Sequence, residues 1–221
     1  MCTYGLCFSN FGFMGNAVVY ALFPEIFVEY VIFTLPLWSL IYIWGAPTLL
    51  IPNEEDATKN KRTFFNVIKP FINPMIISIF IGMILGLLSV QLPVFIATPI
   101  DWLKDCMSPI AMILTGITVG SADLKKTMVQ PVIYIATALR LVVAPLVFIG
   151  ICALFNISSI LPSTYIICML CSLAMPLGLN TIVVPTAYGK DTSVCAGMAV
   201  VSHVLSLATT PLMFELLFLI I

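Results

Sequence analysis

The sequence has few charged residues: Asp, Glu, Lys and Arg make up only 9% of its 221 residues, against about 25% in an average soluble protein. Hydrophobic residues account for 61% of the chain, and the mean hydropathy is +1.15. So few charges cannot cover a water-exposed surface, which argues against a soluble globular domain. The net charge of −1 provides no basic surface for nucleic acid. The composition therefore predicts an integral protein of the lipid bilayer.

The sequence also lacks the motifs of several functional classes. It contains no G-x-x-x-x-G-K phosphate-binding loop, so transport driven by an ATPase of its own is not supported. Cys168 and Cys171 form a C-x-x-C, but no second cysteine pair or histidine accompanies them, and they lie within an apolar run. We expect ordinary membrane-helix cysteines here, and we predict no enzymatic activity, no cofactor and no metal site.

A basic segment is missing from the beginning of the chain. The first basic residue is Lys59, and Met1 leads almost directly into apolar sequence. A secretory signal peptide requires a positively charged segment at its start. We therefore interpret the sequence as an N-terminally truncated form of a larger protein, in which the chain begins partway along the full length.

Long apolar runs are abundant, and a helix needs about 20 residues to cross a bilayer. The runs are continuous and do not alternate in polarity, which favours helices over a β-barrel. The segment 93–105 is predicted to be an interfacial connection. The seven predicted spans are 3–22, 26–51, 71–90, 106–121, 132–155, 163–188 and 193–221.

Basic residues gather on one side of the predicted topology. The loops 53–69, 122–130 and 188–192 hold seven of them, whereas the opposite side holds only Lys104. Because cytoplasmic loops carry the excess of Lys and Arg, these three loops are predicted to be cytoplasmic. The expected location is the cell membrane, with several passes and with the C-terminus outside.

Two of the predicted spans, 3–22 and 163–188, carry polar and helix-breaking residues at their centres. Asparagine is costly in a bilayer unless it is hydrogen-bonded, and glycine or proline is tolerated where other groups satisfy the freed backbone. An unwound centre exposes N–H and C=O groups that can hold a ligand. The alternative is that the asparagines only join helices and that the glycines and prolines only shape the breaks. The candidate substrate-binding residues are Asn10, Gly12, Gly15, Asn16, Pro176, Gly178, Asn180 and Thr181.

The order of the two interrupted spans predicts an inverted repeat. They lie five spans apart and so cross the membrane in opposite directions, as in many secondary transporters. Residues 1–52 would be the last two helices of an N-terminal repeat, 53–69 a cytoplasmic loop, and 70–221 a five-helix C-terminal repeat. The predicted fold is thus an all-α membrane protein, a seven-helix remnant of a ten-helix 5+5 inverted-repeat transporter with two broken crossover helices.

Two ionisable residues lie inside predicted spans. Arg140 is about 13 Å into its helix, and such residues are rare and often functional. It could pair with an anionic substrate, or it could have a structural or snorkelling role, which we favour. His203 lies in the middle of the last span and could relay protons, although a single histidine is more often a packed, hydrogen-bonded residue.

Several short motifs resemble the auxin efflux carrier family of membrane transporters. They are Asn10-Phe11-Gly12-Phe13-Met14-Gly15, Asn73-Pro74, Ser108-Pro109-Ile110-Ala111, Leu139-Arg140-Leu141 and Ala174-Met175-Pro176. The resemblance implies ten spans with crossing broken helices in the fourth and ninth, and the transport of organic anions such as auxin, malate and malonate. One departure is Asn16, where the resemblance leads us to expect proline.

The resulting hypothesis is a secondary active transporter of a small organic anion, with H⁺ or Na⁺ as the coupling ion. The glycine pairs Gly82/Gly86 and Gly116/Gly120 permit close packing and a homodimer. One alternative is a seven-span receptor, against which the predicted outside C-terminus and the absence of an output domain argue. Another is an inactive truncated fragment.

Overall fold

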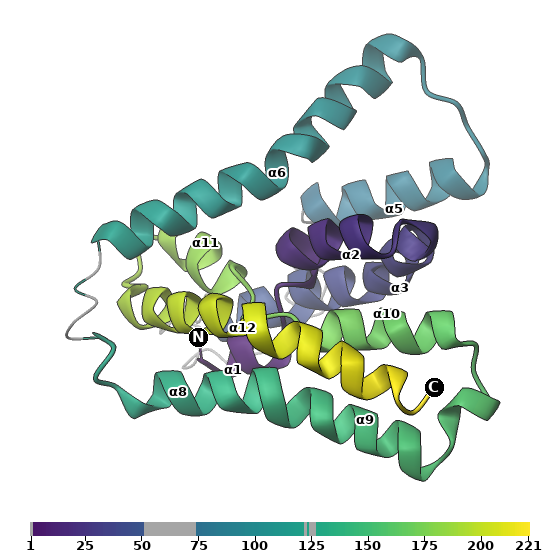
Figure 1. The fold of residues 1–221 in the computed structure, drawn as a ribbon. Helices are drawn as coiled ribbons and strands as arrows, with labels where there is room; N and C mark the ends of the chain where they lie inside the picture. Colours follow the sequence, from purple (N-terminus) through teal and green to yellow (C-terminus); the bar gives the residue numbers. More distant parts are fainter. Residues whose placement is uncertain (1, 51–73, 122, 124–126) are drawn as a thin grey trace, which may run out of the picture.

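A computed structural model describes residues 2–50, 74–121, 123 and 127–221, and this part of the chain is helical apart from one isolated β-bridge. Figure 1 shows the helices meeting near the middle of the molecule, with the N-terminal half of α6 standing away from the others. In chain order the elements are α1 (Cys2–Cys7), η1 (Phe11–Gly15), α2 (Asn16–Leu22), η2 (Pro24–Ile26), α3 (Phe27–Leu40), η3 (Ile41–Leu50), α5 (Pro74–Leu87), α6 (Val94–Ser121), α8 (Pro131–Ala138), η5 (Leu139–Val143), α9 (Ala144–Leu154), η6 (Ile157–Ser159), α10 (Ser163–Leu173), α11 (Asn180–Ala187) and α12 (Ser193–Phe218).

Three helical stretches of the described chain are long and apolar enough to cross a bilayer: Pro24–Leu50, Pro131–Leu154 and Ser193–Phe218. They coincide with the predicted spans 26–51, 132–155 and 193–221. The first two contain a π-helical segment, η3 and η5, which the sequence analysis does not anticipate. A multi-pass membrane protein is therefore supported, while the count of seven spans stays a prediction.

Both predicted interruptions are present in the fold. The first span is divided at Phe8–Asn10, between α1 and η1, and the second at Ala174–Leu179, between α10 and α11. The polar and helix-breaking residues of the first span run from Ser9 to Asn16. Only Phe8–Asn10 are unwound, because Phe11–Gly15 form one wide π-helical turn that leads into α2. The resulting half-helices are each too short to span a bilayer.

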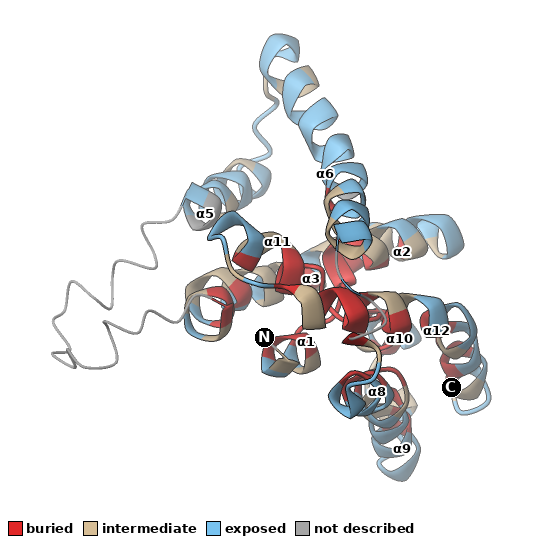
Figure 2. Cartoon of the chain, turned by 90° about the vertical axis from the view of Figure 1, so that its left-hand side faces the viewer, coloured by how far each residue is buried: buried red, intermediate tan, exposed pale blue. Residues whose placement is uncertain are grey.

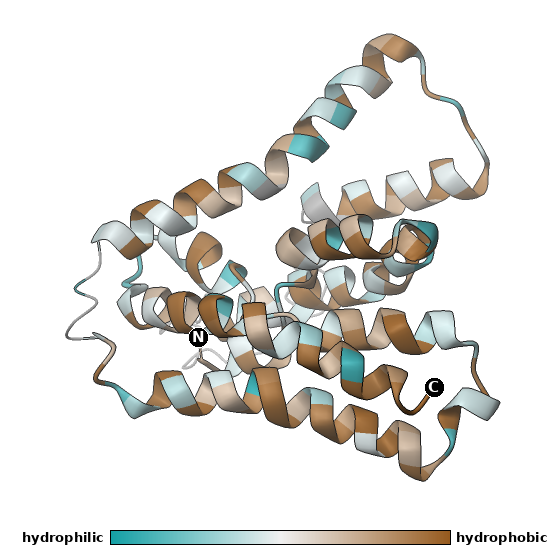
Figure 3. Cartoon of the chain, in the orientation of Figure 1, coloured by the Kyte–Doolittle hydropathy of each residue, from teal (hydrophilic) through white to brown (hydrophobic). Residues whose placement is uncertain are grey.

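The prediction of an interfacial connection at 93–105 is wrong. Residues from Val94 onward belong to α6, a continuous helix of 28 residues with Pro99 and Pro109 inside it. The charged residues Asp101 and Lys104 interrupt the apolar run but not the helix. They are three residues apart on an exposed face of the helix, where their side chains pair at 2.9 Å. The hydropathy colouring of Figure 3 shows hydrophilic patches along this helix.

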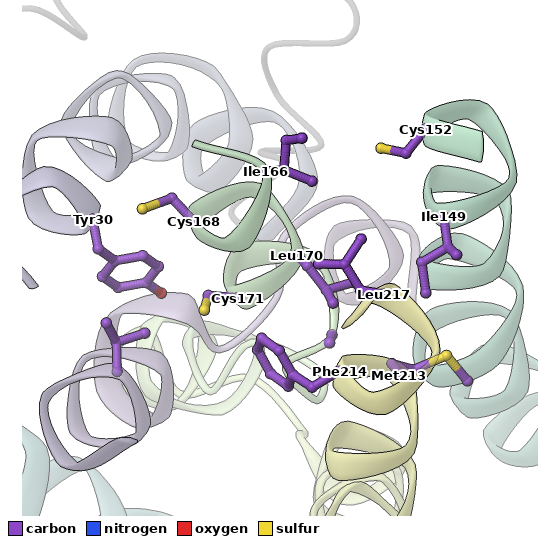
Figure 4. Packing of buried hydrophobic residues seen from close by; sticks show 12 residues of the cluster. Tyr30, Ile149, Cys152, Ile166, Cys168, Leu170, Cys171, Met213, Phe214 and Leu217 are labelled. Carbon is purple, nitrogen blue, oxygen red and sulfur yellow. The ribbon is translucent and has the colours of Figure 1, made fainter. Parts of the chain in front are cut away.

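The buried core lies where α3, α9, α10 and α12 approach one another. Its largest cluster includes Tyr30 from α3, Cys168 and Leu170 from α10, and Phe214 from α12. Figure 4 shows Cys168 pointing toward Tyr30, and Leu170 on the side of α10 that faces α9 and α12. Figure 2 shows buried residues gathered at the centre and mostly exposed ones on α5 and α6. The many exposed Leu, Ile, Val and Phe side chains on the outer faces fit a lipid environment.

The glycine pairs of α5 and α6 make no close contact in the described part of the structure. A Cβ atom placed on Gly82, Gly86, Gly116 or Gly120 would meet nothing within 4 Å. The predicted packing role of these faces, and a homodimer formed through them, stay predictions. The basic loop 53–69, residues 122 and 124–126 of the loop 122–130, and the predicted domain boundaries at 52/53 and 69/70 lie outside the described residues.

Candidate functional site

The two interrupted spans cross at their breaks and are joined there through the backbone. The N–H of Asn10 donates to the carbonyl of Pro176 at 2.8 Å, and the N–H of Gly178 donates to the carbonyl of Phe8 at 3.2 Å. These two bonds form an antiparallel bridge between Ser9 and Leu177. Each unwound segment thus satisfies part of the other's backbone, as a non-helical segment at membrane depth requires.

This close approach depends on the absence of a side chain at Gly178. A Cβ atom there would lie 2.8 Å from the carbonyl oxygen of Phe8 and 3.1 Å from that of Ser9. Both neighbours are backbone atoms that are held in the bridge and cannot move aside independently. Glycine is therefore required at this position by the approach of the opposite chain.

Arg140 joins the two half-helices that precede the breaks. Its Nη1 donates to the carbonyl of Leu6 near the end of α1 at 3.0 Å, and its Nη2 donates to the carbonyl of Ser172 near the end of α10 at 3.2 Å. The last carbonyls of a helix lack partners within the helix and carry partial negative charge, so a cation is favourable there. Arg140 is 4% exposed and has no carboxylate partner among the described residues.

Hydroxyl groups donate further hydrogen bonds to the backbone carbonyls at the C-terminal end of α10. Ser9 donates to the carbonyl of Ser172, which Arg140 also contacts, and Thr210 from α12 donates to the carbonyl of Ala174 at 3.1 Å. The carbonyls freed by the second break are thus held by groups from three other elements. The Nε atom of Arg140 is buried and has no hydrogen-bond partner.

Asn10, at the start of the half-helix that follows the first break, contacts His203 on α12. The Asn10 Nδ2 atom lies 3.0 Å from His203 Nε2, and His203 Nδ1 lies 2.8 Å from the carbonyl of Ala199. A carbonyl only accepts, so Nδ1 carries a proton, and Nε2 of the neutral ring is the acceptor for the Asn10 amide. The Oδ1 atom of Asn10 is buried and has no hydrogen-bond partner among the described residues.

Asn180 occupies the matching position after the second break. It is the first residue of α11, and its Nδ2 donates to the hydroxyl of Tyr4 on α1 at 3.1 Å. The next residue, Thr181, donates its hydroxyl proton to the carbonyl of Gly178 at 2.8 Å. Each break is therefore followed by an asparagine whose amide is bonded to a different element.

The remaining predicted site residues are Gly12, Gly15 and Asn16. The two glycines pack against α3, and Gly15 also lies near Met175 of the second break. A Cβ atom on Gly12 would lie 2.0 Å from the ring of Trp38, and one on Gly15 would lie 2.3 Å from the hydroxyl of Tyr30. These two glycines make room for aromatic side chains. Asn16 begins α2 and has a buried Oδ1 without a partner.

The structure thus brings together part of the predicted set. Asn10, Pro176, Gly178, Asn180 and Thr181 meet at the crossing, with Arg140 and His203 bonded to it, whereas Gly12, Gly15 and Asn16 do not take part. Sequence reasoning missed the polar groups that complete it: Tyr4, Ser9, Ser172 and Thr210. Their signal was weak, because a single Ser, Thr or Tyr is common in membrane helices.

Two hollows lie along α6, and residues outside the crossing line them. An apolar one of about 610 Å³ lies between the first broken span and α6, lined by residues such as Phe13, Val18 and Met112. A more polar one of about 350 Å³ lies between α6 and the loop before α12, with Thr118 and Thr186 among its lining residues. Among the described residues, no group of three or more His, Cys, Asp or Glu side chains could hold a metal ion.

The comparisons with known proteins bear on the family. No curated protein and no solved structure matches the chain. A family model described as membrane transport protein matches residues 1–214, which is nearly the whole sequence. This match confirms the resemblance to the auxin efflux carriers, and the chain belongs to this family of membrane transport proteins.

Proposed function

We propose that this membrane transporter carries small organic anions by secondary active transport, with the crossing of its two broken helices as the binding site. The observation that carries the proposal is the environment of Arg140. A buried guanidinium without a carboxylate partner in the described chain lies at the one place where both spans are unwound. The two carbonyls carry only partial negative charge, so a guanidinium that no carboxylate balances favours an anion nearby in a medium of low dielectric constant.

The half-helices that follow the breaks add to this preference. The N-terminal ends of η1 and α11 carry partial positive charge, which favours carboxylates. Asn10 and Asn180 stand at these two ends and offer amide groups to a ligand. The resemblance to auxin efflux carriers makes dicarboxylates such as malate and malonate, and auxin-like acids, the first substrates to test.

The test is uptake of labelled malate, malonate and indole-3-acetate into proteoliposomes that contain the chain. We expect saturable uptake of at least one of them, and we expect Asn180→Ala to reduce it by more than tenfold. Asn156→Gly is the matched control, because Asn156 lies in a loop with φ of 47°, a conformation that glycine adopts freely. Uptake of none of the three anions, or equal uptake by Asn180→Ala, would contradict the proposal.

We also propose the orientation in which the basic loops 53–69, 122–130 and 188–192 face the cytoplasm and the C-terminus lies outside. The support is the excess of Lys and Arg in these loops. A reporter that is active only in the cytoplasm, fused after Ile221, is expected to be inactive. An active reporter would reverse the orientation and favour the seven-span receptor instead.

A further inference from the structure

The contact between Asn10 and His203 has two hydrogen-bonded states that differ by one proton. We propose that His203 binds the coupling proton of this transporter and that the Asn10 amide turns over in response, so that the crossing gains a free N–H donor when His203 is charged. This inference rests on the proposed function for the identity of the anion. The arrangement of the two side chains stands independently of it.

The positions of the two side chains correspond to a neutral ring. His203 Nδ1–H donates to the carbonyl of Ala199 at 2.8 Å, and the lone pair of Nε2 accepts from Asn10 Nδ2 at 3.0 Å. The Oδ1 atom of Asn10 then points to a buried position without a partner. A buried acceptor without a partner is unfavourable, so this amide orientation is held mainly by the neutral ring.

Protonation reverses the bond between the two residues. A proton added to Nε2 uses its lone pair, the ring becomes a cation, and both nitrogens donate. The Asn10 Nδ2 group would then face a donor, whereas a half-turn of the amide brings Oδ1 to accept from Nε2–H. The bond to Ala199 is kept, and the unsatisfied oxygen gains a partner.

Only the side chain of Asn10 is free to respond. Its N–H is bonded to the carbonyl of Pro176 at 2.8 Å, and its own carbonyl accepts from the N–H groups of Met14 and Gly15 at 3.1 and 2.9 Å. The backbone is thereby fixed in the bridge between the two breaks. Rotation about the bond to the amide group changes what the site presents without moving the crossing itself.

The turn changes the site from one that repels a carboxylate to one that binds it. In the neutral state the free amide atom is an oxygen, which is an acceptor like the carboxylate itself. In the protonated state the free group is Nδ2–H, and the imidazolium adds positive charge beside it. Proton binding and anion binding therefore favour each other, as a proton-coupled symport requires.

Among the described residues, no titratable group is a hydrogen-bond partner of His203. α12 itself carries Cys195 and Glu215, and α11, which packs against it, has no titratable side chain. The elements α6, α8, η5 and α9 pack against α12, and Arg140 in η5 is committed to the carbonyls of Leu6 and Ser172. The titratable or charged groups on these four elements are Asp101, Lys104, Asp105, Cys106, Tyr134, Arg140 and Cys152.

The chain offers an unusually direct test, because His203 is its only histidine. Ring-¹⁵N-labelled histidine in the full chain, held in lipid nanodiscs, reports the protonation of each ring nitrogen by NMR across roughly pH 5 to 8. We expect the neutral ring to carry its proton on Nδ1 and to gain the second on Nε2 as the pH falls. The side-chain amide resonance of Asn10 is expected to move over the same pH range. A neutral ring protonated on Nε2, or an Asn10 amide that does not respond, would overturn the proposal.

A variant of Asn10 tests the direction of the bond. Asn10→Asp places a group there that only accepts, so the ring is expected to stay doubly protonated at a pH where the wild-type ring is neutral. Thr209→Val is the control, because the Thr209 hydroxyl bonds within α12 to the carbonyl of Leu205, and it should leave the histidine titration unchanged. An Asn10→Asp chain that titrates like the wild type would also overturn the proposal.

Binding of malonate separates this inference from the proposed function. We expect the affinity for malonate to rise on the order of tenfold from neutral to acidic pH in the wild type. This rise should be absent in His203→Gln. The His203→Gln variant also shows how much of the pH dependence comes from the titration of malonate itself. If malonate, malate and indole-3-acetate all fail to bind while the NMR switch is observed, the proposed substrate class fails and the switch stands. If they bind with the same pH dependence in His203→Gln, the switch fails and the proposed function stands.

Discussion

The hydroxyl of Tyr4 and the side-chain amide of Asn180 are hydrogen-bonded at 3.1 Å, although 176 positions separate the two residues in the sequence. Tyr4 is fully buried and stacks beside Phe8, with ring centroids 4.9 Å apart. The pair therefore fixes the first half-helix to the residue that begins α11. A phenol in this position orients the amide as well as filling space.

Replacing Tyr4 by phenylalanine is expected to destabilise the fold by about 1 kcal/mol, because Asn180 Nδ2 loses its acceptor while the ring packing is kept. The loss can be measured as the shift in unfolding by SDS in mixed micelles. Tyr20→Phe is the control, since Tyr20 is 66% exposed and its hydroxyl has no such role. Equal stabilities of the two variants would mean that the Tyr4–Asn180 bond contributes nothing.

Arg140→Ala is expected to cost about 3 kcal/mol or more, because two helix-end carbonyls lose charge-assisted donors at the same time. Arg140→Lys should recover only part of this, since an ammonium group cannot reproduce the planar fork that reaches Leu6 and Ser172 together. The same unfolding assay gives both values, with Lys104→Ala as a control at an exposed position. If lysine restored full stability, charge alone would account for the effect of Arg140.

Gly178→Ala and Gly82→Ala form a matched pair with opposite expected signs. At Gly178 the new methyl group would lie 2.8 Å from the carbonyl oxygen of Phe8 and would force the bridge apart, whereas at Gly82 it would meet nothing within 4 Å. We expect strong destabilisation in the first variant and a gain of about 0.5–1 kcal/mol in the second, because alanine favours a helix. Comparable stability of the two variants would contradict the close crossing of the broken spans.

Asp191, in the loop before α12, gives a prediction about pH. The hydroxyl and then the N–H of Ser193 donate to its Oδ1, and these bonds hold the pKa of the carboxyl below its usual value. A lowered pKa in the folded state contributes stability above the unfolded pKa, and this contribution is lost as the pH falls through the folded value. The bonds between Asp191 and Ser193 at the start of α12 are therefore expected to persist at neutral pH and to be lost in acid.

Ser193→Ala removes the hydroxyl donor and is expected to return the pKa of Asp191 towards the value of a free aspartate. The carboxyl carbon resonance of Asp191 in an NMR titration reports this change directly. Thr209→Val on the same helix should leave the titration as it is. An unchanged titration in Ser193→Ala would show that the hydroxyl bond does not stabilise the carboxylate.

The position of the two breaks could be predicted from sequence because they depend on local chemistry. Asn10 and Gly12 in one run, and Pro176 and Gly178 in the other, are poorly suited to a continuous membrane helix. What these residues touch was not predictable, because the partners come from distant segments. Nothing in the sequence near Arg140 indicates that its guanidinium reaches Leu6, which is 134 positions away.

Two other differences have clear physical origins. The first break is shorter than the run of polar and helix-breaking residues at 9–16, because Phe11–Gly15 form a π-helical turn. Glycine residues in a sequence do not distinguish such a turn from an unwound segment. The segment 93–105 is predicted to be an interfacial connection, yet Asp101 and Lys104 pair on the exposed surface of a continuous helix. Hydropathy reports the solvent of a segment and gives little information on where its helix begins.

The bridge between the two breaks also constrains the order of events during synthesis. Ser9 leaves the ribosome 163 residues before Ser172, whose carbonyl its hydroxyl contacts, and the partners of Phe8 and Asn10 at Gly178 and Pro176 follow still later. Until then the first half-helix has polar backbone groups without their final partners, and lipid cannot satisfy them. The contacts of the first break can therefore form only after residues 172–178 have been made.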